Sequence, residues 1–291
     1  MKKYAVIINP AAGRGKGKKL ENTIITLLND ELGDIEVFQT EYPNHAQELA
    51  KQLKDKSSLI IAVGGDGTIN EIVNGMVGGK AALAVIPIGS GNDFTKMLNL
   101  PKEISAVVQT IKDDKRKKID IGKVGDRYFP NGIGIGFDAW VVRESMKVSK
   151  LRGFLIYLYS VIKTVFLYKN QTITLTTNER STVRDIFLIA IGNGKAMGGG
   201  FFLTPRAEVD DGQLDVCIIR ALSKREVLLN LPKAIHGKHT ELEQVEMLRT
   251  DKVNIHSEEG IAVHADGELL GMEFRDLEIS LIPAALEVVV G

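Results

Sequence analysis

The sequence of 291 residues contains a single cysteine, Cys217, and can therefore form no internal disulfide. A lone cysteine inside the apolar run LDVCII is typical of a small buried hydrophobic residue in a reducing compartment, so we expect a cytoplasmic protein. No charge sign dominates either, because 37 basic side chains balance 37 acidic ones. A net charge of zero provides no general attraction to nucleic acid, so any anion site has to be local.

No hydrophobic run is long enough to cross a bilayer. The longest, Phe154–Tyr168, has Lys163 near its centre and falls short of the roughly 20 residues that a spanning helix needs. The N-terminal MKKYAVIINPAAG places lysines before apolar residues, but its apolar part is too short for a secretory signal and ends at a proline. We expect Phe154–Tyr168 to be a helix buried between structural layers, with contact to a membrane surface as the alternative.

Strand and helix patterns alternate along the first part of the chain. Apolar runs such as YAVIIN, LIIAVGG and AALAVIPIG are each followed by a helical pattern, which indicates a parallel sheet covered on both faces. After about residue 120 the pattern changes to short strands separated by turns, among them QLDVCIIR, KVNIHS and GIAVHAD. We predict an N-terminal, mostly parallel three-layer α/β domain at residues 1–122. A C-terminal antiparallel β-sandwich domain would follow at residues 123–291, with the last ~10 residues returning to the first domain.

One strand of the first domain runs straight into three glycines and a carboxylate, in the segment LIIAVGGDGTINE. Ligands of parallel sheets bind at the carboxyl ends of the strands. The backbone N–H groups of Gly64 and Gly65 can approach a ligand closely there, and the next helix begins near a bound phosphate. Asp66 would repel that phosphate unless Mg²⁺ lay between them. The segment fits a metal–nucleotide site, or a glycine turn in which Asp66 only caps the helix.

Two neighbouring loops favour the nucleotide site. INPAAGRGKGKK follows the first strand, and IPIGSGNDF, which contains Asp93, follows the fourth. Parallel strands bring these loops to one edge of the sheet. One polyphosphate site explains the three loops better than three separate helix-capping turns that happen to lie at the same edge. Neither the P-loop spacing nor Gly-x-Gly-x-x-Gly is present, so the nucleotide binds in another arrangement.

Five segments, NPAAG, GGDGTINE, PIGSGNDF, DDGQLDV and ADGE, follow one another in this order. Through them, and over essentially its whole length, the chain resembles the diacylglycerol kinase catalytic family, in particular its soluble bacterial lipid kinases. GGDGT alone also fits the related NAD kinases, but PIGSGNDF together with a late DGE separates the two. The resemblance implies an enzyme that uses ATP and Mg²⁺ to phosphorylate a lipid hydroxyl, with diacylglycerol giving phosphatidate as the first expectation.

The resemblance also implies which residues hold the nucleotide. The family segment GGDGTLN corresponds to Gly64–Asn70, and Ser90 stands where the family has a threonine. The implied nucleotide-binding residues are Asn9, Thr40, Gly64, Gly65, Asp66, Gly67, Thr68, Ile69, Asn70 and Ser90. The family's aspartates linked to the metal through Mg–ATP match Asp66, Asp93 and Asp120.

A second, structural Mg²⁺ is implied at the turn in AEVDDGQLDV. Its ligands would be the side chain of Asp211 and the backbone carbonyls of Glu208 and Gln213, since hard cations prefer oxygen ligands. From the residues alone, this segment is an ordinary Asp-Gly hairpin turn.

The late segment GIAVHADGELLG also reads as a hairpin around Asp266-Gly267. Phosphoryl transfer to an alcohol requires a carboxylate near the attacking hydroxyl. The resemblance assigns that role to Glu268 as catalytic base, together with Asp66 and Asp93 at the metal, and Asp266 is the reserve candidate for the base.

The lipid substrate is expected at a membrane surface, so the protein would be peripheral to the inner face of the membrane. Within the protein, we expect the lipid between the domains, beside Asn131–Trp140 and Phe154–Tyr168. Edge strands of the β domain leave a homodimer open. The pair His236 and His239 in HGKH is expected at a solvated helix end.

Three other functions remain open from the sequence. The acceptor could be another lipid, such as phosphatidylglycerol or a sphingoid. The enzyme could be NAD kinase-like, with a soluble acceptor. A non-enzymatic nucleotide sensor would retain the loops and lack turnover, although the presence of Glu268 argues against it.

Overall fold

The computed structural model describes residues 3–148, 151, 154–178 and 180–291. The chain divides into two compact units, the first made of residues 1–120 and 283–291 and the second of residues 121–282. Two long strands, β5 (Arg116–Val124) and β13 (Glu268–Val289), cross these boundaries, so each contributes residues to both units.

The first unit alternates strands and helices. Its strands are β1 (Tyr4–Ile8), β2 (Ile35–Gln39), β3 (Leu59–Gly64) and β4 (Ala82–Pro87). Its helices are α1 (Ala12–Leu32), α2 (His45–Leu53), α3 (Asp66–Met76), α4 (Asp93–Met97) and α5 (Ile104–Asp113).

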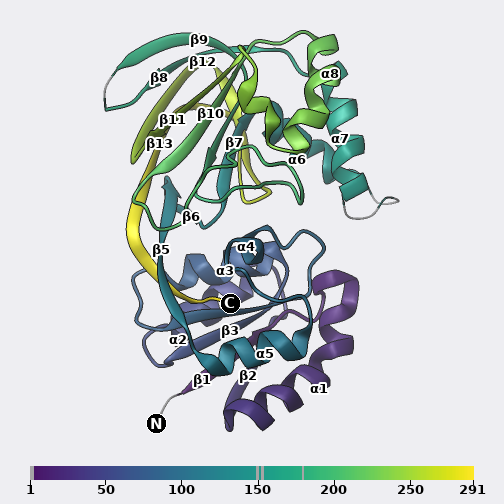
Figure 1. The fold of residues 1–291 in the computed structure, drawn as a ribbon, viewed down its shortest axis with the longest axis vertical. Coiled ribbons are helices and arrows are strands. Elements are labelled where there is room, and N and C mark those ends of the chain that lie inside the picture. Colours follow the sequence, from purple (N-terminus) through teal and green to yellow (C-terminus); the bar gives the residue numbers. More distant parts are fainter. Residues whose placement is uncertain (1–2, 149–150, 152–153, 179) are drawn as a thin grey trace. The chain divides into compact units, whose positions relative to one another are not determined.

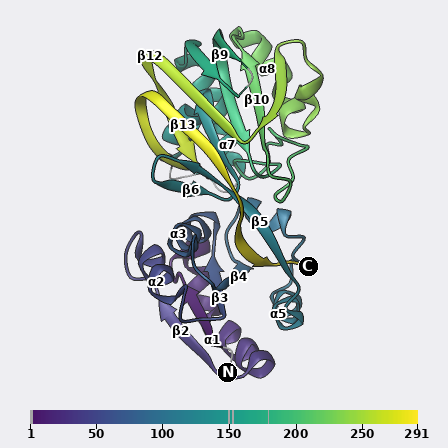
Figure 2. The same cartoon turned by 90° about the vertical axis from the view of Figure 1, so that its left-hand side faces the viewer.

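The sheet of this unit is parallel, in the order β4-β3-β1-β2, with the end of β13 joining β4 through the pair Val288 and Leu83. Its central strands are buried on both faces because helices cover both. Alternate residues such as Ile61 and Val63 pack against Ile24 and Leu28 of α1 and against α5, while α2 and α3 cover the opposite face. Figure 2 shows α2 and α3 on one side of these strands and α5 on the other. The carboxyl ends of β1, β3 and β4 therefore lie along one edge.

Helix α1 begins earlier than the sequence pattern suggests. The helical periodicity is clear only from about Leu20, whereas the element begins at Ala12 and is interrupted at Gly13, Arg14 and Gly15, whose φ angles are +59°, +59° and +86°. Glycine adopts positive φ without penalty, so the glycines allow the chain to turn sharply after β1 before the regular helix continues.

The second unit consists mainly of antiparallel strands. They are β6 (Arg127–Phe129), β7 (Gly132–Gly136), β8 (Gln171–Thr176), β9 (Ser181–Gly192), β10 (Leu214–Arg220), β11 (Val245–Thr250) and β12 (Lys252–Ala265), with parts of β5 and β13. Its helices are α6 (Phe137–Ser145), α7 (Phe154–Leu167), α8 (Lys224–Ile235) and a short 3-10 helix, η1 (Lys238–Glu241).

The strands of this unit pair in the order β11-β10-β9-β7-β12-β13, and β8 joins β9 and β12. Residues on one face of each strand, among them Ile133, Ile189 and Val216, form a common core. Residues on the other face of β9 and β10 pack against α6, α7 and α8. Figure 1 shows these three helices gathered on one side of the strands. The predicted fold class, a parallel α/β domain followed by a β-sandwich-like domain, is confirmed.

Two strands of this unit differ from the sequence expectation. KVNIHS and GIAVHAD form one strand, β12, with an irregular register around Gly260, whose φ is +80°. A bulge of this kind bends a strand without ending it. Strand β11 was not predicted, because VEMLRT is only partly buried and has no clear alternation. Among the described residues, no helix combines the length and the hydropathy that crossing a bilayer requires.

Candidate functional site

The three glycine-rich loops of the first unit meet. A Cβ atom added to Gly89 would lie 2.7 Å from the Cα of Gly65, and one added to Gly13 would lie 2.3 Å from the carbonyl oxygen of Ile88. Both distances are too short for any side chain, so glycine is required for this approach. The convergence proposed from parallel strand ends is therefore present in the structure.

Side chains and backbone groups hold the first loop against the GGDGT segment. The Nδ2 of Asn9 donates to the hydroxyl of Thr68 at 2.9 Å, and the Oδ1 of Asn9 accepts from the N–H of Ala11. The N–H of Thr40 donates to the carbonyl of Ile8. Asn9, Thr40 and Thr68 thus lie around the end of β1.

Asp66 and Asp93 lie close together at this junction. One oxygen of Asp66, Oδ2, accepts the N–H of Asn92 at 2.7 Å, and the N–H groups of Asp93 and Phe94 also stabilise its charged form. Burial, followed by the charge of Asp93, nevertheless raises the pKa of Asp66. Its other oxygen, Oδ1, is buried and has no hydrogen-bond partner within the described part of the chain. Asp93 is also buried, and its Oδ1 accepts from the Nζ of Lys96 at 2.8 Å.

The unpartnered oxygen of Asp66 is the feature that fits a cation. A buried carboxylate oxygen without a partner is costly, and a divalent ion between it and a phosphate would remove that cost. No three His, Cys, Asp or Glu side chains of the described residues are arranged to bind a metal ion. A Mg²⁺ at Asp66 and Asp93 would therefore take its remaining ligands from phosphate oxygens and water, as is usual for this ion.

The other residues predicted to bind the nucleotide differ from one another in exposure and in contacts. Gly67 borders open space in the first turn of α3, and Ser90 is exposed in the third loop. Asn70 is buried, and its side chain accepts from Asn74. Ile69 is fully buried, and its N–H donates to the carbonyl of Gly65, so it contributes to the protein core.

Asp120 lies in β5, where its Oδ1 accepts the N–H of Ala284 at 2.7 Å. This bond fixes β5 to the last part of β13. The role of Asp120 at a metal stays a prediction.

The DGE segment of the second unit is a two-residue hairpin between β12 and β13. Asp266 and Gly267 have φ angles of +47° and +81°, as a type I′ turn requires. The Oδ1 of Asp266 accepts the N–H groups of Asn131 and Gly132 at 3.2 and 2.8 Å. Asp266 therefore anchors the turn to β7. The side chain of Glu268 is half exposed and pairs with Arg127.

A buried pair beneath this turn was missed by the sequence reasoning. The Nε2 of His264 lies 2.9 Å from the Oδ2 of Asp138, and the N–H of Gly267 donates to the Nδ1 of His264 at 3.3 Å. With Nδ1 accepting from Gly267, Nε2 is the ring nitrogen that donates to Asp138. The pair connects α6 to the hairpin that carries Glu268.

The glycines of GIGIG make room for this pair. Ile133 and Ile135 point into the core, whereas Gly132, Gly134 and Gly136 present the other face of β7. A Cβ on Gly134 would lie 2.2 Å from the Nε2 of His264. The alternating glycines were the available signal for a covered strand face, but they did not indicate what covers it.

At the DDG turn, Asp211 pairs with Arg249 and also accepts the N–H of Gln213. Asp215 is buried, and burial, followed by the charge of Glu208, raises its pKa. The carboxylates gathered here suit a cation, but Arg249 already supplies a positive charge. The structural Mg²⁺ at Glu208, Asp211 and Gln213 stays a prediction.

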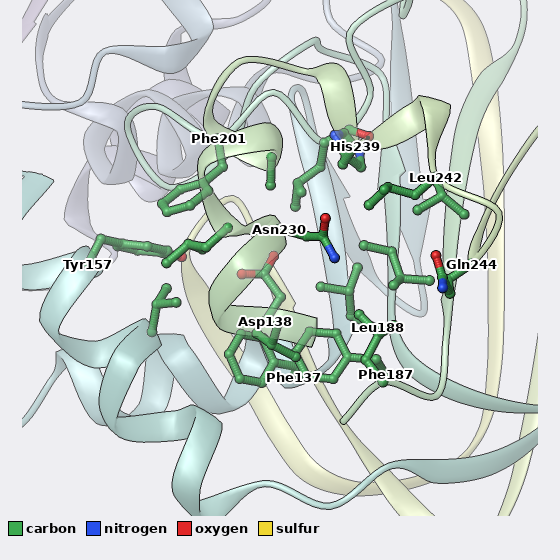
Figure 3. Close-up of a pocket in the computed structure, with 18 residues that line it drawn as sticks. Phe137, Asp138, Tyr157, Phe187, Leu188, Phe201, Asn230, His239, Leu242 and Gln244 are labelled. Atoms are coloured by element: carbon green, nitrogen blue, oxygen red, sulfur yellow. Dashed lines mark hydrogen bonds between the residues drawn. The ribbon is translucent and has the colours of Figure 1, made fainter. Parts of the chain in front are cut away.

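An apolar pocket lies inside the second unit and opens to solvent. Its walls are mainly aromatic and aliphatic residues of α7, α8, β9 and β10. Figure 3 shows polar side chains among them, including Asp138, Asn230, His239 and Gln244. The expectation of a solvated His239 is wrong, because the helical end of HGKH folds inward. His239 is buried beside the carbonyl of Leu203, and burial lowers its pKa.

Comparison with known families matches both parts of the chain. The family described as "Diacylglycerol kinase catalytic domain" matches residues 3–124, and the family described as "YegS C-terminal NAD kinase beta sandwich-like domain" matches residues 131–290.

Similar proteins cover nearly the whole chain. YtlR of Bacillus subtilis (strain 168) is 31% identical over 93% of this chain and 94% of its own length. A diacylglycerol kinase of Mycobacterium tuberculosis (strain ATCC 25618 / H37Rv) is 27% identical over 98% of this chain and 94% of its own. One crystal structure from Bacillus anthracis str. Sterne is 26% identical, with a TM-score of 0.84 over 100% of this chain and 97% of that one. Yeast NADH kinase complexed with NADH shares only the fold, at 12% identity and a TM-score of 0.56, covering 100% of this chain and 84% of that one.

Proposed function

Because this chain belongs to the diacylglycerol kinase catalytic family of lipid kinases, we propose that it transfers the γ-phosphoryl group of ATP to a lipid hydroxyl with the help of Mg²⁺. The first expected acceptor is diacylglycerol, which would give phosphatidate. The observation that carries the proposal is the junction of three glycine loops around Asp66, whose buried Oδ1 has no partner among the described residues.

In this proposal the loop junction binds the triphosphate. Backbone N–H groups around Gly65, Gly67 and Gly89 donate to phosphate oxygens, because no Cβ atoms keep the ligand away. Asp66 and Asp93 would hold Mg²⁺, which neutralises charge on the β- and γ-phosphates when bound. Most of the acceleration would come from positioning and electrostatics, since phosphoryl transfer needs little covalent help from the protein.

Glu268 is the proposed base. Its carboxylate accepts the proton of the acceptor hydroxyl as that oxygen forms a bond to the γ-phosphorus, and the bond from the γ-phosphorus to the bridging oxygen of ADP breaks. The half-exposed side chain of Glu268 favours it over Asp266, whose Oδ1 already accepts two backbone N–H groups. Arg127, the partner of Glu268, would orient the carboxylate.

The apolar pocket supports a lipid acceptor rather than a second nucleotide. A pocket walled by side chains such as Phe137, Phe187 and Leu231 offers an acyl chain apolar contact and offers a dinucleotide few hydrogen bonds. Asp138 and Asn230 could accept or donate hydrogen bonds at the polar end of the lipid. Phosphatidylglycerol and sphingoid bases remain alternative acceptors.

The test is a transfer assay with γ-labelled ATP and an acceptor panel in mixed micelles: diacylglycerol, phosphatidylglycerol, sphingosine and NAD. We expect label in a lipid product, and Glu268→Gln should reduce turnover at least about 100-fold while ATP binding, measured by calorimetry, is retained. Asp276→Asn, on the same strand and exposed, is the matched control. Label in NADP alone would support the NAD kinase alternative, and ATP binding without any transfer would support the sensor.

A further inference from the structure

His264 connects two parts of the second unit that the proposed reaction uses. Its Nδ1 accepts the N–H of Gly267, in the DGE turn, at 3.3 Å, and its Nε2 lies 2.9 Å from the Oδ2 of Asp138 in α6. Both His264 and Asp138 are buried, so bulk water does not compete for either contact. One buried ring therefore links α6 to the turn that precedes Glu268.

The proposed base lies directly beyond this turn. Glu268 stands opposite Ala265 in the register of β12 and β13, and Ala265 follows His264 in the chain. Asp266 holds the turn to the start of β7, because its Oδ1 accepts the N–H of Gly132. The backbone before Glu268 is thus held at two points, by Asp266 and by His264, and the contact through His264 continues to a helix.

The other end of the link belongs to the apolar pocket. Asp138 lines this pocket together with Asn230 and His239, and Figure 3 shows its carboxylate among the side chains of the pocket wall. Asp138 lies in the first turn of α6, where the free N–H groups of a helix favour a negative charge. Two hydrogen bonds therefore separate a carboxylate of the pocket wall from the turn that precedes Glu268.

Stability alone does not account for this buried pair. Apolar side chains of similar volume in place of a buried polar pair often leave the free energy of unfolding unchanged or raise it. The neighbouring strand is shaped to fit the pair, since Gly134 lies opposite His264 and a Cβ atom there would collide with both His264 and Asp138. One position of β7 thus has no side chain, and the pair occupies the space.

We propose that Asp138 and His264 are a positioning pair for phosphoryl transfer. They hold the DGE turn, and with it the carboxylate of Glu268, in a fixed place relative to an acceptor bound in the pocket. The inference rests on the proposed function, because it takes Glu268 as the base and the pocket as the acceptor site. His264 acts through Glu268 and not on the reacting atoms, and misplacing a reacting group by about 1 Å can lower a rate about 100-fold.

Two substitutions of His264 each retain one half of the link. His264→Asn keeps an acceptor oxygen near the position of Nδ1, within reach of Gly267, but is too short to reach Asp138. His264→Gln keeps a donor near the position of Nε2 and loses the acceptor beside Gly267. We expect both variants to lower kcat for transfer to dioctanoylglycerol about tenfold or more. The affinity for ATP, measured by calorimetry, should stay within about twofold of that of the unaltered protein.

Asp138 is tested by keeping or removing its acceptor oxygen. Asp138→Asn can still accept from the Nε2 of His264, whereas Asp138→Ala cannot. We expect Asp138→Asn to retain transfer within about threefold of the unaltered protein and Asp138→Ala to lose about tenfold or more. Equal losses in these two variants would contradict a role through this hydrogen bond.

His256→Asn is the matched control. His256 also lies on β12, and its Nδ1 lies 2.7 Å from the Oδ1 of Asp276 on β13, but this pair is at the exposed surface. The control variant should transfer label as fast as the unaltered protein, because its pair has no contact with the DGE turn.

A double-mutant cycle asks whether His264 acts through the base. In a protein that already carries Glu268→Gln, His264→Asn should lower the residual transfer by less than about twofold, because the group that it positions is no longer a base. A general structural defect would lower transfer by the same factor with and without Glu268→Gln. Circular dichroism melting identifies a His264 variant that fails to fold, and the other variant then carries the test.

Full transfer by either folded His264 variant would overturn the proposal, because one half of the link would then suffice. Equal factors in the double-mutant cycle would also overturn it. The proposed function fails separately. It fails if the unaltered protein transfers label to no lipid, or if Glu268→Gln transfers at the full rate. A defective Glu268→Gln together with fully active His264 variants removes only the positioning role.

Discussion

The substitution Gly134→Ala tests the buried pair that supports the DGE hairpin. Gly134 lies directly opposite His264 in the β7–β12 register, and the new Cβ would lie 2.2 Å from the Nε2 of His264 and 2.4 Å from the Oδ2 of Asp138. Both atoms belong to the 2.9 Å hydrogen bond of the pair. The methyl group can therefore fit only if that bond is broken or the strands move apart.

The expected cost has two parts. Overpacking a core position costs about 1–3 kcal/mol, and leaving a buried donor or acceptor without its partner costs about 1–3 kcal/mol more. We expect the free energy of unfolding, from urea titration followed by circular dichroism, to fall by about 2–6 kcal/mol.

Gly125→Ala is the matched control. Gly125 has a φ of +54°, and a Cβ atom added there would have no neighbour within 4 Å, so the change should cost only backbone strain of about 1 kcal/mol. A loss below about 1 kcal/mol for Gly134→Ala, or equal losses for both variants, would refute the packing argument. Transfer activity should fall with Gly134→Ala even where the protein remains folded, because the pair supports the turn that carries Glu268.

Three further predictions concern buried charge, a buried thiol and acid stability. Asp66→Asn removes a buried charge near Asp93, so the ligand-free protein should gain about 1 kcal/mol in urea unfolding while turnover falls at least about 100-fold; loss of stability would contradict this. Burial raises the pKa of Cys217 to about 12, so iodoacetamide at about pH 8 should label it only as fast as the protein unfolds, and rapid labelling of the folded protein would show an accessible thiol. The hydrogen bond from Arg184 lowers the pKa of Glu246 below its ordinary value of 4.5. The stabilisation that Glu246 provides is therefore complete above that ordinary value and is lost as the pH falls through the lowered pKa. In the Glu246→Gln variant, the free energy of unfolding from urea titration should depend less on pH in that range.

Much of the first unit could be predicted because its signals are local. Buried parallel strands are continuous apolar runs, and β1, β3 and β4 stand out for that reason. The glycines at their carboxyl ends then indicated a ligand-binding edge. The start of α1 could not be predicted, because the positive φ angles of Gly13, Arg14 and Gly15 depend on how the loop packs beside Ile88.

The second unit was harder because antiparallel pairing leaves weaker local patterns. The bulge at Gly260 joined two expected strands into β12. His239 was expected in water, yet the chain after α8 turns inward and buries it. The apolar run of α7 correctly indicated a helix, but the expectation that this helix is buried between structural layers is wrong, because five of its large apolar side chains are 43–59% exposed. The sequence could not separate its pocket face from its exposed face, since both are apolar.

The sequence by itself determined the alternation of elements, the fold class and the three loops, because periodicity and glycine placement act over a few residues. Only the tertiary structure decided which groups meet. Asp66 accepts an N–H group 26 positions away, and Asp138 pairs with a histidine 126 positions away. Such contacts depend on the packing of whole strands and helices, and no local spacing in the chain records them.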